Sequence, residues 1–244
     1  DHSSGDSGMR ALRTGAASLL NSDAGHESQD AGVPMDMNES NRVAPEGSQR
    51  LNWATFLDRV AQLADAQFRP TWDQEAHVAH VAQLMELLDL SDPAIIEAYS
   101  HYADEIRGFP ELSDVYEEPD FKLSTLEFEP GEVIELHDHP DMTGVILCVS
   151  GEVEIEHFDE LDEISADGNP LVKRCQRVVL TDGMNATLTA SRGNIHTLRA
   201  IRFTQLLDVF TPPYNEDRIT RSRWFQRADD EYEGRPDVYE AWLE

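Results

Sequence analysis

Apolar and polar positions divide the chain into stretches of different character. Residues 1–50 are rich in Ser, Gly, Asp and Asn and show no periodicity, which predicts a disordered N-terminal tail. Over 51–110, apolar residues recur at helical spacing in three segments, 51–67, 73–88 and 91 to about 106. Pro70 and the sequence Ser91-Asp92-Pro93 separate these segments. We therefore expect a small cap of two or three helices.

From residue 111 to 244, short β-branched and apolar segments alternate with Gly, Asp and Pro turns. The segments cover 122–136, 143–158, 173–190 and 195–210. Many short strands at regular spacing are typical of an all-β sandwich or barrel. The fold is thus predicted to be mainly β, a barrel with a small N-terminal helical segment and a C-terminal extension. Five aromatic residues beyond Thr211-Pro212-Pro213 are expected to pack back on the barrel: Trp224, Phe225, Tyr232, Tyr239 and Trp242.

Three histidines are the candidate metal ligands. His137 and His139 are two residues apart in a predicted strand, so their side chains project to the same face. His196 follows a turn that opens a later strand. In a jelly roll, strands that are remote in sequence lie side by side, so this third imidazole can complete the site.

The spacing around these residues resembles the two motifs of the cupin superfamily, G-x5-H-x-H and, later, G-x2-H. The resemblance implies a double-stranded β-helix (jelly-roll) barrel. Gly144 occupies the position where ordinary cupins carry a glutamate ligand. Without that carboxylate, three neutral imidazoles leave a divalent metal near its full charge, with open positions for an anionic thiolate, an adjacent amine and dioxygen. Adding both oxygen atoms to sulfur would give a sulfinic acid.

Two longer stretches narrow the resemblance. Residues 136–143 (LHDHPDMT) closely match LHDHPGMT, and 206–214 (LLDVFTPPY) resemble LDVxxPPY. Both are hallmarks of the cysteamine (2-aminoethanethiol) dioxygenase and plant cysteine oxidase family of thiol dioxygenases. The resemblance covers roughly 51–244. It implies an Fe(II) enzyme that uses O2 to oxidise cysteamine or proteins and peptides beginning with cysteine.

When the family's site residues are matched to this sequence by position, the resemblance implies that the iron ligands are His137, His139 and His196. Asp208 would bind the substrate's ammonium group or orient its thiol, and Tyr214 would lie at the pocket edge. Two positions depart from the family pattern. Asp141 replaces a glycine, which adds charge beside the site. Ser222 stands where relatives have a cysteine, so their Cys–Tyr cross-link is not expected here.

Several other residues carry side chains that could bind a metal, and the cupin motifs also occur with other functions. Asp138 should point away from the metal, whereas Glu135 shares the ligand face by parity and is an alternative ligand. His77 and His80 form an HxxH pattern on a predicted helix that could bind zinc. Because no partner ligands are near in sequence, surface or helix-packing roles are favoured for both. Cys148 is expected to be an inert core residue. The alternative functions are a metal-dependent cupin isomerase or oxygenase acting on a non-thiol substrate, and a non-catalytic ligand-binding cupin.

Charge and cysteine usage narrow the partners and the compartment. The formal net charge of −29 repels phosphate backbones and anionic bilayers, so neither nucleic acid nor a membrane surface is expected as a partner. Two cysteines without a CxxC pair suit a reducing compartment, and the cytoplasm is predicted. Residues 9–21 weakly resemble the start of a transit peptide, so organellar targeting is the alternative. No apolar run is long enough for a membrane helix. The protein is expected to be a monomer.

Overall fold

The computed structural model describes residues 50–98, 111–214 and 221–244. Its helices are α1 (Trp53–Ala64), the short 3-10 helix η1 (Asp65–Phe68), α2 (Gln74–Glu86), α3 (Pro93–Ala98) and, near the C-terminus, the short 3-10 helix η2 (Tyr232–Gly234). The side chains of Asn52 and Asp73 accept hydrogen bonds from the first turns of α1 and α2, which explains where these helices begin. The helices predicted over 51–67 and 73–88 are confirmed. The predicted tail up to residue 49 and the third helix beyond residue 98 lie outside the described residues.

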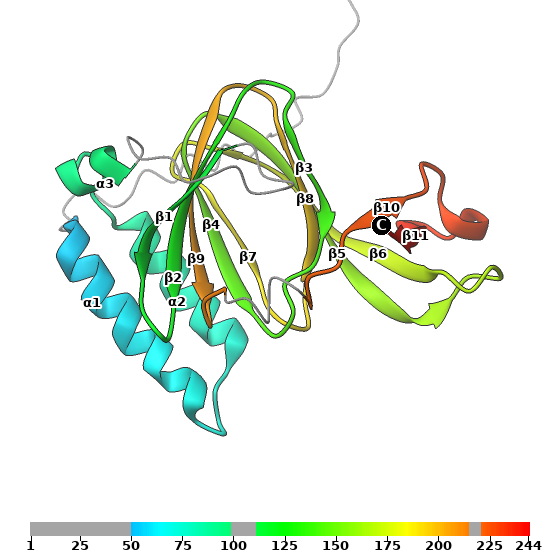
Figure 1. The fold of residues 1–244 in the computed structure, drawn as a ribbon, viewed down its shortest axis with the longest axis horizontal. Helices are drawn as coiled ribbons and strands as arrows, with labels where there is room; N and C mark the ends of the chain where they lie inside the picture. The colour runs from blue at the N-terminus through cyan, green and yellow to red at the C-terminus, as the bar shows by residue number, and fades with distance from the viewer. Residues whose placement is uncertain (1–49, 99–110, 215–220) are drawn as a thin grey trace, which may run out of the picture. The chain divides into compact units, whose positions relative to one another are not determined.

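Antiparallel strands form two sheets (Figure 1). One sheet has the order β1-β2-β9-β4-β7 and the other β10-β11-β6-β5-β8-β3. The strands are β1 (Glu111–Glu117), β2 (Lys122–Phe128), β3 (Val133–His137), β4 (Thr143–Ser150), β5 (Glu152–Ile164), β6 (Pro170–Thr181), β7 (Asn185–Leu188), β8 (Ile195–Ala200), β9 (Thr204–Thr211), β10 (Phe225–Arg227) and β11 (Val238–Leu243). Several pairs join strands that are distant in sequence, such as β2 with β9 and β3 with β8. This topology is the predicted double-stranded β-helix barrel, with a small helical segment before it.

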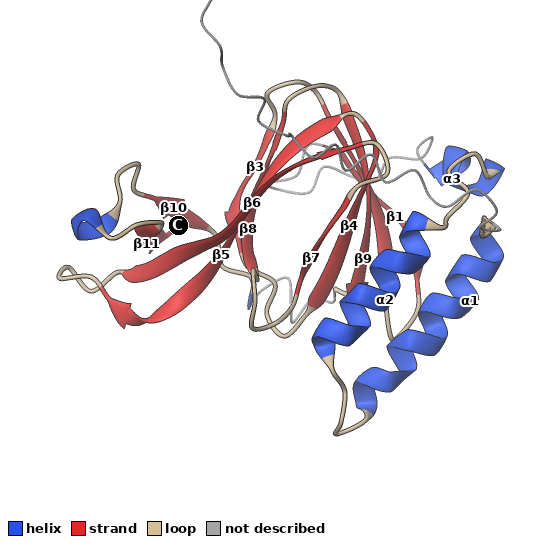
Figure 2. Ribbon diagram, turned by 180° about the vertical axis from the view of Figure 1, so that it is seen from behind, coloured by secondary structure: helices blue, strands red, loops and turns tan. Residues whose placement is uncertain are grey.

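Helices α1 and α2 cover the outer face of the five-stranded sheet (Figure 2). Alternate residues of β4 and β9, including Val145 and Val209, pack outward against helix residues such as Phe56 and Met85. The intervening residues, such as Ile146, point into the barrel and pack against the six-stranded sheet. Because both faces are buried, these strands have near-continuous apolar sequences rather than a polar alternation.

The C-terminal segment was not predicted to form strands, yet it extends the six-stranded sheet through β10 and β11. Phe225 and Tyr239 are buried there against Phe158 of β5, as the sequence predicted for these aromatic residues. Trp242 keeps 38% of its surface exposed. None of the described helices has the length and apolar character needed to cross a membrane.

Candidate metal centre

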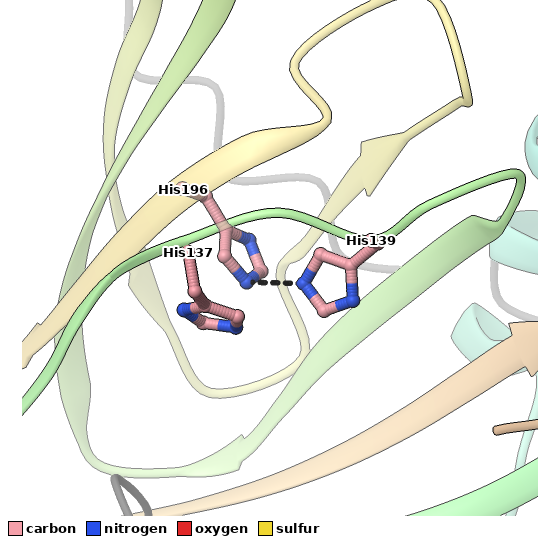
Figure 3. A group of neighbouring side chains, drawn as sticks. All are labelled: His137, His139 and His196. Atoms are coloured by element: carbon pink, nitrogen blue, oxygen red, sulfur yellow. Dashed lines mark hydrogen bonds between the residues drawn. The ribbon is translucent and has the colours of Figure 1, made fainter. Parts of the chain in front are cut away.

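His137, His139 and His196 converge inside the barrel (Figure 3). His137 ends β3 and lies directly opposite His196 of β8, while His139 follows two residues after β3. All three are buried, and the nitrogen atoms available for ligation lie within 4.8 Å of one another. Within the described part of the chain, this is the one cluster of three or more His, Cys, Asp or Glu side chains that is arranged to hold a metal ion.

The spacing of two nitrogens fits a shared metal ion. The Nε2 atoms of His139 and His196 lie 2.9 Å apart. Metal–imidazole bonds of about 2.1 Å that meet at a right angle place their nitrogens roughly 3.0 Å apart. The two rings therefore already face each other as neighbouring ligands of one ion would.

Burial also keeps the three rings in the protonation state that a metal requires. It lowers the pKa of His137 to about 4, although a hydrogen bond to the Glu135 carbonyl opposes the shift. It holds the pKa values of His139 and His196 well below 6.5, and neighbouring histidines add to the effect. Neutral imidazoles have a free lone pair for a metal, so protons do not compete for this site near neutral pH.

Hydrogen bonds at Nδ1 orient two of the three rings. His137 donates from Nδ1 to the Glu135 carbonyl oxygen at 2.7 Å. His139 Nδ1 is hydrogen-bonded to the hydroxyl of Tyr214. Each bond leaves Nε2 directed at the centre of the group, as in metal sites whose ligands are held by an outer hydrogen bond.

Asn194 connects the two histidine motifs. Its side chain accepts a hydrogen bond from the His139 backbone N–H at 3.0 Å and donates to the His139 carbonyl at 2.9 Å. It also donates to the Thr189 carbonyl at 3.0 Å. The turn that precedes His196 is thereby fixed against the segment that carries His139.

A β-bulge corrects the parity argument for Glu135. Ile134 pairs with Leu198 and His137 with His196, so the register shifts between them and the inward face changes parity. Glu135 is consequently exposed, and it contributes its carbonyl rather than its carboxylate. The alternative that Glu135 approaches the metal is wrong for this reason.

Phe210 of β9 fills the space beside Gly144. Its ring stacks on His139 with centroids 4.9 Å apart. A Cβ atom placed at Gly144 would come within 2.7 Å of the Phe210 ring. The absence of a side chain at Gly144 therefore makes room for the aromatic ring that packs against His139, one of the three candidate ligands.

The C-terminal segment completes the site on the side of His137. Trp224 stacks on the His137 ring at 4.7 Å and pairs with it through an isolated bridge. Asp138 accepts from the backbone N–H and the Nε of Arg223, at 2.6 and 2.7 Å, and the same guanidinium binds Glu160. Asp138 thus points away from the histidine group, as expected, and links this segment to the strand that carries His137.

Asp141 does not add an unpaired charge at the centre. Its φ of 59° is in the left-handed region, which Asp tolerates better than most residues and which favours the glycine of the family pattern. Its exposed carboxylate forms an ion pair with Arg221 at 3.0 Å.

A cavity of about 540 Å³ opens onto the three histidines. Asp208, Tyr214 and Ser222 all line it, together with Phe210 and Trp224. Asp208 points inward from β9, and burial raises its pKa well above 3.8. Its Oδ1 has no hydrogen-bond partner among the described residues. Tyr214 keeps its proton at neutral pH, since burial, then Asp208 and Asp138, raise its pKa.

His157 of β5 was not among the residues predicted from the sequence. This residue is buried, pairs directly with His196 across the sheet, and has its ring 5.5 Å from the His196 ring. A signal was present, because Val153, Ile155 and His157 alternate with three glutamates and so share the inward face.

The remaining candidate residues are structural. His77 is buried on α2 with its ring edge-on to Trp72, whereas His80 is exposed, so the two do not form a joint site. Cys148 is fully buried in the barrel core, and burial raises its pKa to about 12. Both observations agree with the predictions.

The fold and the histidine group define this protein as a cupin with a candidate three-histidine metal centre. The family model PCO_ADO matches residues 86–239. The chain belongs to the PCO_ADO family.

Two relatives are named 2-aminoethanethiol dioxygenase. The mouse protein is 27% identical over 124 residues, and the match covers 42% of this chain and 48% of the relative. The human protein is 27% identical over 126 residues, with 42% and 47% coverage. The chain thus spans about half the length of the curated relatives it matches.

Solved structures resemble the chain only weakly. KdgF from Halomonas sp. is 19% identical, with a TM-score of 0.37 over 48% of this chain and 91% of that protein. A cupin superfamily protein from Desulfitobacterium hafniense is 16% identical, with a TM-score of 0.33 over 47% and 85%.

Proposed function

We propose that this chain is a non-heme iron(II) thiol dioxygenase. It adds both atoms of O2 to the thiol of cysteamine or of an N-terminal cysteine and forms a sulfinic acid. The observation that carries the proposal is the set of three buried, neutral histidines at the wall of a cavity, with Gly144 where a carboxylate ligand would stand. Membership of the PCO_ADO family and the similarity to the two 2-aminoethanethiol dioxygenases support it.

His137, His139 and His196 would hold the iron. When bound, iron(II) supplies a centre that brings a thiolate and O2 together and exchanges electrons with them. Three imidazoles bring no negative charge to this centre, which favours an anionic substrate group such as a thiolate. Phe210 and Trp224 stack on two of the rings and so shield them from water.

Asp208 is suited to bind the amine beside the thiol. It lies on the opposite sheet from His137 and His196 and lines the same cavity. Its unpaired Oδ1 can accept a hydrogen bond from a substrate ammonium, and this positive charge favours the ionised carboxylate that burial disfavours. The same contact would fix the direction from which the thiol enters.

Cavity size bears on the substrate class. Cysteamine has only a handful of non-hydrogen atoms, whereas about 540 Å³ is in the range of sites that take much larger ligands. The wall beyond Asp208 contains Leu112, Asp114 and Ser124 from β1 and β2. This room supports a cysteine-initiated peptide as a substrate alongside cysteamine.

Oxygen consumption by the iron(II)-loaded protein tests the proposal. The substrates are cysteamine, free cysteine, a cysteine-initiated peptide and the same peptide with an acetylated amine, with products weighed by mass spectrometry. We expect a product heavier by two oxygen atoms, which is absent with the His196→Ala variant and reduced with the acetylated peptide. No uptake with any thiol, despite stoichiometric bound iron, would refute thiol oxidation and favour a non-thiol substrate or a binding role.

A further inference from the structure

A fourth buried histidine, His157, lies in the same row as two of the candidate ligands. The register places His157 of β5 opposite His196 of β8, and His196 opposite His137 of β3. Directly opposed residues of antiparallel strands share a face, so the three imidazoles form one row across the sheet. The proposed metal centre uses only two members of this row.

The tautomer of His157 is set by the main chain. Its Nδ1 lies 2.9 Å from the Gly193 carbonyl oxygen, which can only accept a hydrogen bond. Nδ1 therefore carries the proton, and Nε2 of the neutral ring carries a lone pair. This Nε2 is buried and has no hydrogen-bond partner among the described residues.

His196 has the complementary unsatisfied atom. Its Nε2 faces His139 and is the ligand atom, so its Nδ1 must carry the proton. That Nδ1 is buried and has no partner in the described parts of the chain. By contrast, His137 and His139 each have a hydrogen bond at Nδ1. A buried donor and a buried acceptor thus remain on two neighbouring rings whose centroids are 5.5 Å apart.

We propose that His157 is a positioning residue that accepts a hydrogen bond from Nδ1–H of His196 when a metal is bound. The inference rests on the metal centre of the proposed function. It completes a chain from the Gly193 carbonyl through His157 to His196, and it gives the third ligand the outer hydrogen bond that the other two possess. Such a bond fixes the ring orientation and raises the basicity of the ligating nitrogen.

Gly193 is the residue that permits this chain. It has a φ of 61°, and an added Cβ atom would lie 3.2 Å from both Cβ and Nδ1 of His157. Its N–H donates to Asp159 at 2.5 Å, which holds the turn in place. The glycine of the G-x2-H motif therefore lets the backbone approach His157 closely enough for its carbonyl to select the tautomer.

A matched pair of variants separates positioning from a structural role. Glutamine at 157 keeps an acceptor near the place of Nε2, whereas asparagine keeps only a donor near the place of Nδ1. The full chain is stripped of metal and titrated with Co²⁺, read by its visible absorption and by competition with a chelator. We expect His157→Asn to weaken Co²⁺ binding by about 10- to 100-fold and His157→Gln to retain affinity to within a few-fold. The reverse order, with Asn retaining affinity and Gln losing it, would show that the bond to Gly193 alone matters and would overturn the proposal.

The wild-type protein gives a second readout that needs no variant. In the Zn²⁺-loaded chain, long-range ¹H–¹⁵N spectra report which nitrogen of each imidazole carries a proton. We expect His157 and His196 each to carry a proton on Nδ1, and Nε2 of His157 to carry none. The Nδ1 proton of His196 should resonate downfield and be protected from exchange. A proton on His157 Nε2, or an unprotected His196 Nδ1–H, contradicts the proposal, as does failure of the three histidines to bind Co²⁺ or Zn²⁺. Because neither readout uses thiol oxidation, the inference stands or fails separately from the reaction.

Discussion

Replacing Gly144 by alanine tests how a missing carboxylate shapes this site. Gly144 lies in the extended backbone of β4, which any residue adopts, so the change introduces no backbone strain. The new methyl group would approach Cε1 of Phe210 to 2.7 Å and Cγ of Leu188 to 3.2 Å. An ordinary carbon contact is about 3.5 Å or more, so the Phe210 ring must move by roughly 0.8 Å. It has little freedom to do so because it packs between His139 and Tyr214.

The Gly144→Ala change has two effects of opposite sign on the free energy of unfolding. Gly→Ala in a compatible backbone stabilises a protein by about 0.4–1 kcal/mol through the unfolded state. Overpacking a buried site costs about 1–3 kcal/mol. The steric effect should prevail, so Gly144→Ala is expected to lower the free energy of unfolding by roughly 0.5–2 kcal/mol. Displacement of His139 should also weaken Co²⁺ binding by about tenfold or more.

Urea unfolding of the metal-free chain and Co²⁺ titration measure both effects. Phe210→Leu in the Gly144→Ala background should recover part of each loss, since it removes the ring edge that the methyl group meets, and the four proteins form a double-mutant cycle. A Gly144→Ala variant that is as stable as the wild type or more so, with unchanged Co²⁺ affinity, would refute the argument.

Three further outcomes are expected. Asp208→Asn should raise the urea midpoint of the metal-free chain, because a carboxyl group whose pKa is raised in the folded state opposes folding once the pH exceeds 3.8. The same variant should lower kcat/KM for an amine-bearing thiol by about 10- to 100-fold. An unchanged kcat/KM would contradict the contact with the substrate ammonium. Tyr214→Phe should weaken Co²⁺ binding by about tenfold with little change in the urea midpoint, because the hydroxyl is hydrogen-bonded to His139. A lower urea midpoint with unchanged Co²⁺ affinity would show that the hydroxyl has only a structural role. Burial lowers the folded pKa values of His137 and His77 to about 4, below the unfolded value of 6.5, so the unfolded chain takes up protons first as the pH falls. Urea unfolding should therefore show a free energy of unfolding that is constant above pH 6.5 and falls toward pH 4, by up to roughly 3 kcal/mol per histidine. Equal stability at pH 7 and pH 5 would show that these two rings are not buried in the neutral form.

The sequence alone singled out the three candidate metal-binding residues. His137 and His139 are close in sequence and carry their own strand pattern, so local spacing was sufficient to single them out. His196 could be added because its turn and distance matched a known motif. The helices over 53–64 and 74–86 and the barrel strands were likewise visible, since their apolar periodicity is a property of the local chain.

Only the tertiary structure decided how the site is supported. The bulge that turns Glu135 outward depends on the pairing of β3 with β8, which no local pattern encodes. Phe210 and Trp224 reach the histidines from strands or segments far away in sequence, and their roles follow from packing. Strands β10 and β11 form because a sheet edge is available to pair with them, not because their own sequence is strongly alternating.

His157 illustrates which part of the site can be predicted from the sequence and which part requires the tertiary structure. Its inward direction could be read from alternation along β5, yet its significance depends on which residue lies opposite it and on a carbonyl thirty-six positions away. Side-chain chemistry and strand period are local, so the sequence reveals them. Hydrogen bonds and close contacts between segments depend on register and on how the sheets close, and these are settled only when the whole chain is folded.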